Sequence, residues 1–228
     1  FETQVIRAEL GGQDSIEFLG SSEDERFYSF AEQGVAFMVG ADSTATARGV
    51  GFDRVTARPG SESDEAVMRG MNGLDHVEIA AEAVEVTNPS GIQTAVGFEK
   101  TYTYLADSGD DTVNVSGTVG NDTLVGKHDW ASFSAGGYSH FFRGFKSATI
   151  DAGEGLDAFY LQDTVHDDQV VMRSGLTTFS NLLFSITLNG FETQVATSVH
   201  GGLDSVQMFD SELDDNLYSK RDFTTMQN

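Results

Sequence analysis

Short segments in which apolar and polar residues alternate run along the chain, bounded by glycine, aspartate and serine. A period of two is typical of β-strands that bury one face, and strands of about 4–8 residues fit these segments. The pattern predicts strands at 112–115, 123–125, 191–198, 205–209 and 217–220. Because turns fall near every eleventh residue, we expect an all-β array.

The stretch 64–86 is rich in alanine and glutamate, which favour a helix when they are considered alone. Its place in an internal repeat predicts strands instead. We follow the repeat, because the same register holds along the rest of the chain.

The repeat is marked by Gly-Phe dipeptides that end at Phe52, Phe98, Phe145 and Phe191, with spacings of 46, 47 and 46 residues. The five residues that begin at Phe1 recur at Phe191. One domain, 1–228, is therefore divided into five units: 1–50, 51–96, 97–143, 144–189 and 190–228. Such a period predicts a repeat architecture, and we expect the chain to be a segment of a longer protein.

Two acids occupy corresponding places in every unit. The first follows the phenylalanine by 12 or 13 residues and the second follows 11 residues later: Asp14 and Glu25, Asp64 and Asp75, Asp111 and Asp122, Asp157 and Asp168, Asp204 and Asp215. Many stand in a Gly-x-Asp-x-apolar pattern. Glycine adopts positive φ without steric cost and aspartate accepts hydrogen bonds from nearby amides, so these sites predict turns.

A unit of about 46 residues is long enough for two coils of a parallel β-helix. We therefore predict a parallel β-helix, or β-solenoid, of five units with about two coils each, forming a rod somewhat under about 50 Å long. The phenylalanines of the Gly-Phe pairs, and Phe141, Phe142, Phe145, Phe179 and Phe184, are expected inside it. The alternative is a five-bladed β-propeller, whose blades have a similar length.

The chain has 36 acidic and 13 basic residues, a formal charge of −23, and no cysteine. A field this negative repels phosphate backbones and argues against nucleic-acid binding. No apolar run approaches the roughly 18 residues of a membrane-spanning helix, so we expect no membrane insertion. Without cysteine there are no disulfides, thiolate metal sites or thiol nucleophiles.

Calcium is the cofactor that the clustered acids suggest, because Ca²⁺ binds six to eight oxygen atoms, many from carboxylates. The candidate ligands are Asp110, Asp111, Asp122, Asp157, Asp163, Asp167, Asp168, Asp204, Asp210, Asp214 and Asp215. The competing interpretation is that each aspartate only caps its own turn. Stacked like charges need either a cation or solvent, and the two roles can coexist.

No catalytic group stands out. The five histidines lack the spacing of a helical metal site, and no nucleophile elbow or phosphate loop is present. Trp130 and its neighbouring histidines could form a sugar-stacking platform, although packing at a turn is the simpler interpretation. Arg26, Arg69 and Arg173 are expected to pair with carboxylates, so we do not predict an enzyme.

The pattern Gly-x-Asp-x-apolar, present in six places such as Gly155-Leu156-Asp157-Ala158-Phe159, resembles the second half of the haemolysin-type (RTX) calcium-binding repeat. The step here is eleven residues rather than nine, and the leading Gly-Gly is absent. Over the whole chain, the units resemble tandem repeats of large bacterial secreted or surface proteins.

This resemblance implies an extracellular or cell-surface protein with a structural or adhesive role, and the clustered acids suggest that calcium could stiffen its turns. The expected partners are neighbouring repeat domains of the same protein, or extracellular glycans. The alternative function is a carbohydrate-active β-helix, either similar to a polysaccharide lyase or sugar-binding.

Overall fold

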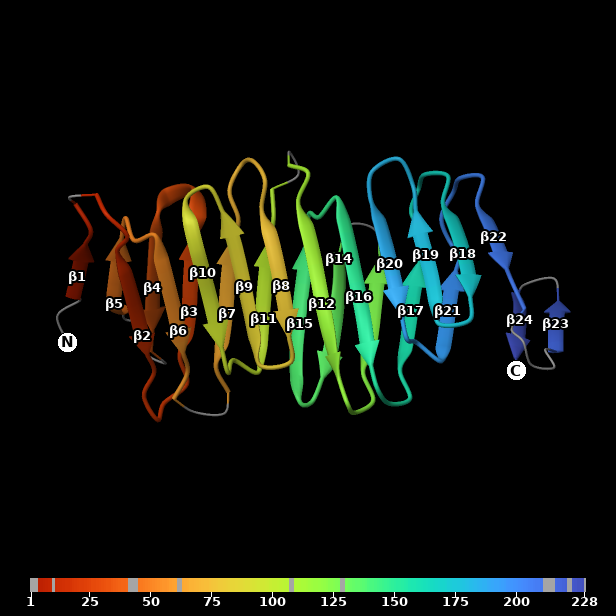
Figure 1. Ribbon diagram of the computed structural model, residues 1–228, viewed down its shortest axis with the longest axis horizontal. Coiled ribbons are helices and arrows are strands. Elements are labelled where there is room, and N and C mark those ends of the chain that lie inside the picture. The colour runs from red at the N-terminus through yellow and green to blue at the C-terminus, as the bar shows by residue number, and fades with distance from the viewer. Residues whose placement is uncertain are drawn as a thin grey trace.

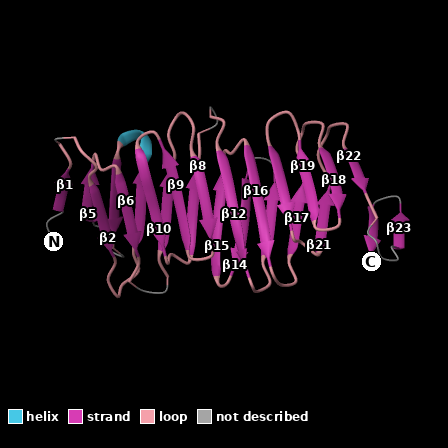
Figure 2. Ribbon diagram, in the orientation of Figure 1, coloured by secondary structure: helices cyan, strands magenta, loops and turns pink. Residues whose placement is uncertain are grey.

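Two long β-sheets lie face to face and enclose the hydrophobic core (Figure 1, Figure 2). The computed structural model describes residues 4–9, 11–40, 45–60, 63–106, 109–127, 130–210, 216–220 and 223–227. Each sheet contains eleven strands, so ten spacings of about 4.8 Å give a length of about 48 Å. No helix in these ranges is both long and apolar enough to cross a membrane.

Strand neighbours do not follow the order of the sequence. Sheet A contains, in spatial order, β1 (Gln4–Arg7), β5 (Ala45–Val50), β4 (Val35–Val39), β3 (Arg26–Phe30), β7 (Glu65–Arg69), β11 (Lys100–Tyr104), β15 (Tyr138–Arg143), β14 (Trp130–Ala135), β13 (Thr123–Lys127), β17 (Ala158–Gln162) and β21 (Thr193–Thr197). Sheet B contains β2 (Ser15–Leu19), β6 (Arg54–Arg58), β10 (Gly91–Val96), β9 (Ala83–Asn88), β8 (His76–Ala80), β12 (Thr112–Thr118), β16 (Ser147–Gly153), β20 (Ser185–Asn189), β19 (Leu176–Ser180), β18 (Gln169–Arg173) and β22 (Ser205–Met208). A short 3₁₀ turn covers Ala31–Gln33, and β23 (Asn216–Lys220) pairs only with β24 (Phe223–Gln227) in the described part.

Each complete unit contributes five strands by the same rule. Its first strand lies in one sheet, its second crosses to the other, and its third to fifth return as an antiparallel meander beside the first. In the third unit, for example, β11 pairs in parallel with β15, while β14 links β15 to β13. The next unit begins in the opposite sheet, so meanders alternate between sheets A and B.

The predicted all-β solenoid is confirmed, and the strands form two continuous sheets rather than the separate blades of a propeller. The winding differs from two plain parallel coils per unit, because each meander introduces one antiparallel strand. These strands are β4, β9, β14 and β19. The stretch 64–86 is extended, in β7, β8 and β9, as the repeat predicted.

The Gly-Phe dipeptides mark the corners where the chain leaves a meander and crosses to the other sheet. Their glycines have φ between +78° and +84°, which side chains with a Cβ rarely adopt. Phe98, Phe145 and Phe191 are buried behind them, as expected, whereas Phe52 is half-buried against the core. They pack on rings from strands rather than in a ladder of their own: Phe98 on Phe27, for example, with ring centroids 6.2 Å apart.

Phe142, Phe145, Phe179 and Phe184 also lie inside, as predicted. Phe141 is different, because it faces outward from sheet A and is only half-buried. Alternation along β15 explains the difference: its neighbour Phe142 occupies the inward position.

Candidate functional site

The repeated acids lie where strands begin, along the two edges of the solenoid. The strands of sheet A, apart from β4 and β14, run in one direction, and most of those of sheet B run in the other, as Figure 1 shows. Strand starts of the two sheets therefore lie on opposite edges. The acids that precede β3, β7, β13 and β17 gather at one edge, and those that precede β8, β12, β18 and β22 gather at the other.

Hydrogen bonds join these acids into ladders that pass from unit to unit. The backbone N–H of Asp75 donates to the carboxylate of Asp111 over 2.7 Å. The same bond joins Asp122 to Asp157 over 2.6 Å and Asp168 to Asp204 over 3.1 Å. Each first acid thus caps the second acid of the preceding unit, which satisfies a backbone donor at a sheet edge.

The second acids also cap their own turns. The backbone N–H groups of Met71, Thr118 and Thr164 donate to Asp75, Asp122 and Asp168, at 2.9, 2.6 and 2.6 Å. A glycine precedes two of these donors, because a Cβ on Gly70 or Gly117 would lie 2.2 or 2.7 Å from the carboxylate. The carboxylates are therefore tightly enclosed caps.

Burial makes several of these carboxylates reluctant to ionise. Asp75, Asp111 and Asp157 are at most 1% exposed. Burial raises the pKa of Asp75 and Asp157 and brings that of Asp111 to about 6, although hydrogen bonds from backbone N–H groups act in the opposite direction. One oxygen each of Asp111 and Asp157 is buried without a hydrogen-bond partner among the described residues.

Asp163 is a special case, because it occupies the position that glycine holds in the corresponding turns. Burial alone would raise its pKa. Its carboxylate accepts hydrogen bonds from the backbone N–H groups of Val199 and His200 and from the Ser198 hydroxyl, and it also contacts the His200 ring. Together these contacts bring the pKa of Asp163 below its ordinary value. This carboxylate fastens the turn of the fourth unit to that of the fifth.

The structure distributes the predicted calcium ligands along both edges. Asp111, Asp122, Asp157, Asp163 and Asp168 are buried, Asp204 is half-buried, and Asp110, Asp167 and Asp210 are exposed. Asp214 and Asp215 lie outside the described residues. Within the described ranges, no three acid or histidine side chains gather as a metal-binding group. The described carboxylates suit capping better than a site with six to eight oxygen ligands, and calcium binding stays a prediction.

The sequence-based ligand set omitted several acids that belong to the ladders. Glu99 accepts the N–H of Asp64 over 3.1 Å and Glu192 accepts that of Asp157 over 2.7 Å. Asp53 accepts the N–H of Asp14 over 2.9 Å. All three directly follow a Gly-Phe dipeptide, which is the signal by which the sequence could have identified them.

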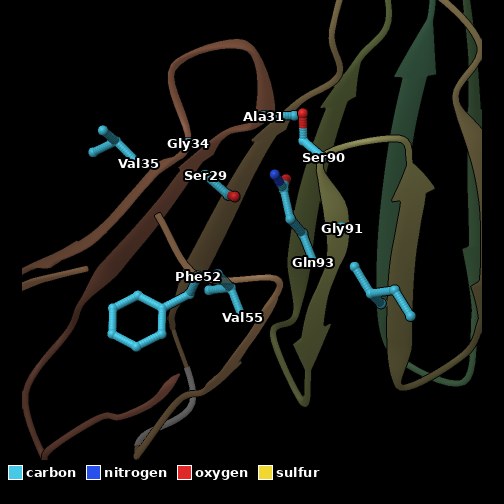
Figure 3. Close-up of a pocket in the computed structure, with 10 residues that line it drawn as sticks. Ser29, Ala31, Gly34, Val35, Phe52, Val55, Ser90, Gly91 and Gln93 are labelled. Atoms are coloured by element: carbon cyan, nitrogen blue, oxygen red, sulfur yellow. The ribbon is translucent and has the colours of Figure 1, made fainter. Parts of the chain in front are cut away.

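A small polar cavity lies between the sheets near the 3₁₀ turn (Figure 3). Its volume is about 20 Å³, enough for one water molecule. Gln93 of sheet B reaches toward Ser29 of sheet A across this space. The side-chain oxygens of both are buried without a protein partner in the described part, so the cavity suits a structural water rather than an organic ligand.

The outer face of sheet A carries the second candidate site. Side chains alternate between inside and outside along each strand, and the registers align the outward ones into rows across the sheet. On six neighbouring strands, from β3 to β13, one such row reads Phe30, Arg69, Tyr104, Arg143, Trp130 and Lys127. We call it the aromatic–cation row, since rings and cations alternate along it.

Ring contacts hold the aromatic–cation row in place. The Arg69 guanidinium lies 5.7 Å from the ring centroid of Phe30 and 5.5 Å from that of Tyr104. Trp130 stacks on Phe141 of the adjacent row at 5.6 Å, and Tyr104 lies 5.9 Å from the same ring. The row is thus an ordered, solvent-facing surface of π-systems and positive charge.

These contacts change two interpretations of the sequence. Of the three arginines expected to pair with carboxylates, Arg26 does so, with Glu65 at 2.6 Å. Arg69 and Arg173 instead lie over aromatic rings, Arg173 at 4.5 Å from that of Phe209. Trp130 packs in a ring cluster, but on an outer face rather than in a turn, and His128 lies outside the described residues.

Positive charge is concentrated on this face. Its outward positions hold seven of the 13 basic residues of the chain: Arg7, Arg26, Arg48, Arg69, Lys100, Lys127 and Arg143. Among the described positions of the same face there is one acid, Glu65, which pairs with Arg26. A chain of charge −23 therefore presents one locally positive surface.

The outer face of sheet B has a different chemistry. One of its rows reads Asn114, Thr149, Thr187 and Thr178, and the row beside it Thr112, Ser147, Ser185 and Ser180.

Comparisons of the chain with family models, with curated proteins and with solved structures gave no match.

Proposed function

We propose that this chain is a structural or adhesive repeat module of an exported bacterial protein. The observation that supports the proposal is the unit rule: the strands of the described ranges pair only within a unit or with the next unit, so each added unit lengthens both sheets. The edge ladders link successive units in the same way. A rod of this kind separates or displays other parts of a protein.

Duplication of two units tests the proposal. A second copy of 51–143 inserted in register adds five strands to each sheet, so the longest dimension in small-angle scattering grows by about 24 Å. The urea m-value grows as well, since more surface is exposed on unfolding. A particle that broadens without lengthening contradicts a modular rod.

The extracellular location rests on the resemblance of the units to repeats of secreted and surface proteins. Fractionation of cells that express the full-length protein, with an antibody against this segment, tests it. We expect the segment at the cell surface or in the medium, and retention in the cytoplasm contradicts the proposal.

Calcium stiffening is a separate proposal, favoured by the buried carboxylates that lack a full set of donors. If Ca²⁺ binds only the folded chain, calcium at about 100 times its dissociation constant stabilises the fold by about 2.7 kcal/mol. The thermal midpoint then rises in calcium and falls in excess chelator. An unchanged midpoint assigns these acids to capping alone.

Sugar binding is favoured over polysaccharide cleavage as the second function. The aromatic–cation row offers rings and positive charge on an open, flat face. Chemistry on a uronate needs a base held close to the substrate, whereas this row only presents a surface.

A further inference from the structure

We propose that the aromatic–cation row binds a linear polysaccharide in which an acidic sugar alternates with a neutral one. The row consists of Phe30, Arg69, Tyr104, Arg143, Trp130 and Lys127, on six neighbouring strands of sheet A. The inference deepens the adhesive role proposed above and rests on it, because it supplies the ligand class and the surface.

The spacing of the row matches such a polymer. Neighbouring strands are about 4.8 Å apart, so the cations on β7, β15 and β13 recur about every 9.6 Å along the sheet. A disaccharide of an extended polysaccharide has about this length. An acidic sugar can then meet each cation, and a neutral sugar each intervening ring.

The chemistry of each position also fits. The apolar face of a pyranose packs on an aromatic ring, and Tyr and Trp combine a large contact area with a polar atom for a hydroxyl. The planar guanidinium of Arg69 is exposed, and arginine pairs with a carboxylate through two parallel hydrogen bonds. Because rings already hold Arg69 in position, binding costs less side-chain entropy.

The distribution of charge explains why a sparsely charged polymer is favoured. The row lies at the strand ends, close to the adjoining turns, where the acid Glu32 follows Phe30 by two residues. A ligand on the row therefore meets the cations with acidic charge close by, which favours a polymer whose negative charges are widely spaced. Nucleic acid carries a charge at every nucleotide, and the total charge of −23 disfavours so dense a polyanion.

The experiment measures binding of the 228-residue chain to hyaluronan, a polymer with one carboxylate per disaccharide, by calorimetry at two salt concentrations. We expect saturable binding, weaker at high salt, and little binding to neutral dextran. The double variant Arg69→Gln/Lys127→Gln should bind at least about tenfold more weakly, because each cation donates charged hydrogen bonds. Arg69→Lys should lose part of the affinity, since it keeps the charge without the planar fork.

The control is Arg54→Gln/Arg173→Gln, which removes the same charge from the outer face of sheet B and should change the affinity less than twofold. Equal losses in the two double variants overturn the proposal, because net charge alone would then govern binding. Absence of hyaluronan binding, or equal affinity for single-stranded DNA or anionic vesicles, also overturns it. A chain that fails to bind but lengthens on unit duplication rejects this ligand and leaves the rod intact.

Discussion

The outer faces of sheets A and B are built by the same five-strand unit and enclose the same core, but their chemistry differs. Face A presents aromatic rings and seven basic residues against one acid. Face B presents threonine, serine and asparagine in rows such as Asn114, Thr149 and Thr187, and the same row continues to the acids Glu78 and Glu85. Because inward positions, turns and edge caps are equivalent in the two sheets, folding does not account for the difference. Outward positions are where a repeat can acquire a function without disturbing its fold.

Both sheets pack on the same hydrophobic core, so a substitution that disrupts the core should destabilise both faces together. Phe142 is fully buried and its ring lies 5.6 Å from that of Phe145. Replacement of Phe142 by alanine should destabilise the fold by about 3–5 kcal/mol, through lost burial and the cavity left behind. Urea unfolding measures this, and Phe142→Leu should cost much less. A similar loss in both variants would contradict tight packing at this site.

The edge caps should be equivalent on the two sheets even though the faces are not. Asp122 precedes β13 of sheet A and Asp168 precedes β18 of sheet B, and each accepts a backbone N–H over 2.6 Å. Removal of either carboxylate by alanine should cost about 1.5–3 kcal/mol, because a donor loses a charged partner. Asparagine keeps one acceptor and should cost less. If only one of the two alanine variants is destabilised, the caps at the two edges do not contribute equally to stability.

Matched changes on the two outer faces sharpen the contrast. Tyr104→Ala on face A removes ring contacts with Arg69 and Phe141 and should cost about 1–2 kcal/mol. Thr149→Ala on face B should stay within about 0.5 kcal/mol, as for most surface substitutions. Thermal unfolding of the two variants tests this. A larger loss for Thr149 would show that the hydroxyl rows, and not the rings, support the structure.

The smallest effect is a pH dependence at an edge. Burial raises the pKa of Asp111 to about 6 from 3.8, so the native state holds this proton more tightly than the unfolded state. Stability is therefore lost as pH rises through about 6 and is regained in full below about 3.8. Asp111→Asn keeps an acceptor for Asp75 and should raise the thermal midpoint at pH 7.5 more than at pH 5.

Asp210→Asn is the control for this prediction, because it removes the same formal charge at an exposed position that does not act on the pKa of Asp111. An equal pH response in the two variants would assign the effect to the charge of the whole chain.

The sequence identified the positions that every unit must repeat. Corner glycines, buried phenylalanines and turn acids such as Asp75 and Asp122 are fixed by backbone geometry, so they recur with the period of the fold. The same register placed strands in 64–86 despite its helix-favouring composition. Local propensity gave way to tertiary pairing there.

The meanders were not predicted, because a period of two shows which residues share a face but not which sheet a strand joins. Their tight turns do have a signal: Gly34, Gly136 and Gly175, at hairpin ends, have φ between +57° and +69°. The aromatic–cation row was also missed. It runs from Phe30 to Lys127 through three units, and only strand register shows that its residues share a row.

Because each unit has an odd number of strands, successive units begin in opposite sheets. One added unit turns every later face to the opposite side of the rod, whereas two added units restore it. A continuous row therefore requires units of two kinds in strict alternation. Outward positions should repeat about every 93 residues, while glycines and turn acids keep a step of about 46. Gain or loss of a single unit would divide such a row between the two sides of the rod, so arrays of this kind should vary in length by pairs of units.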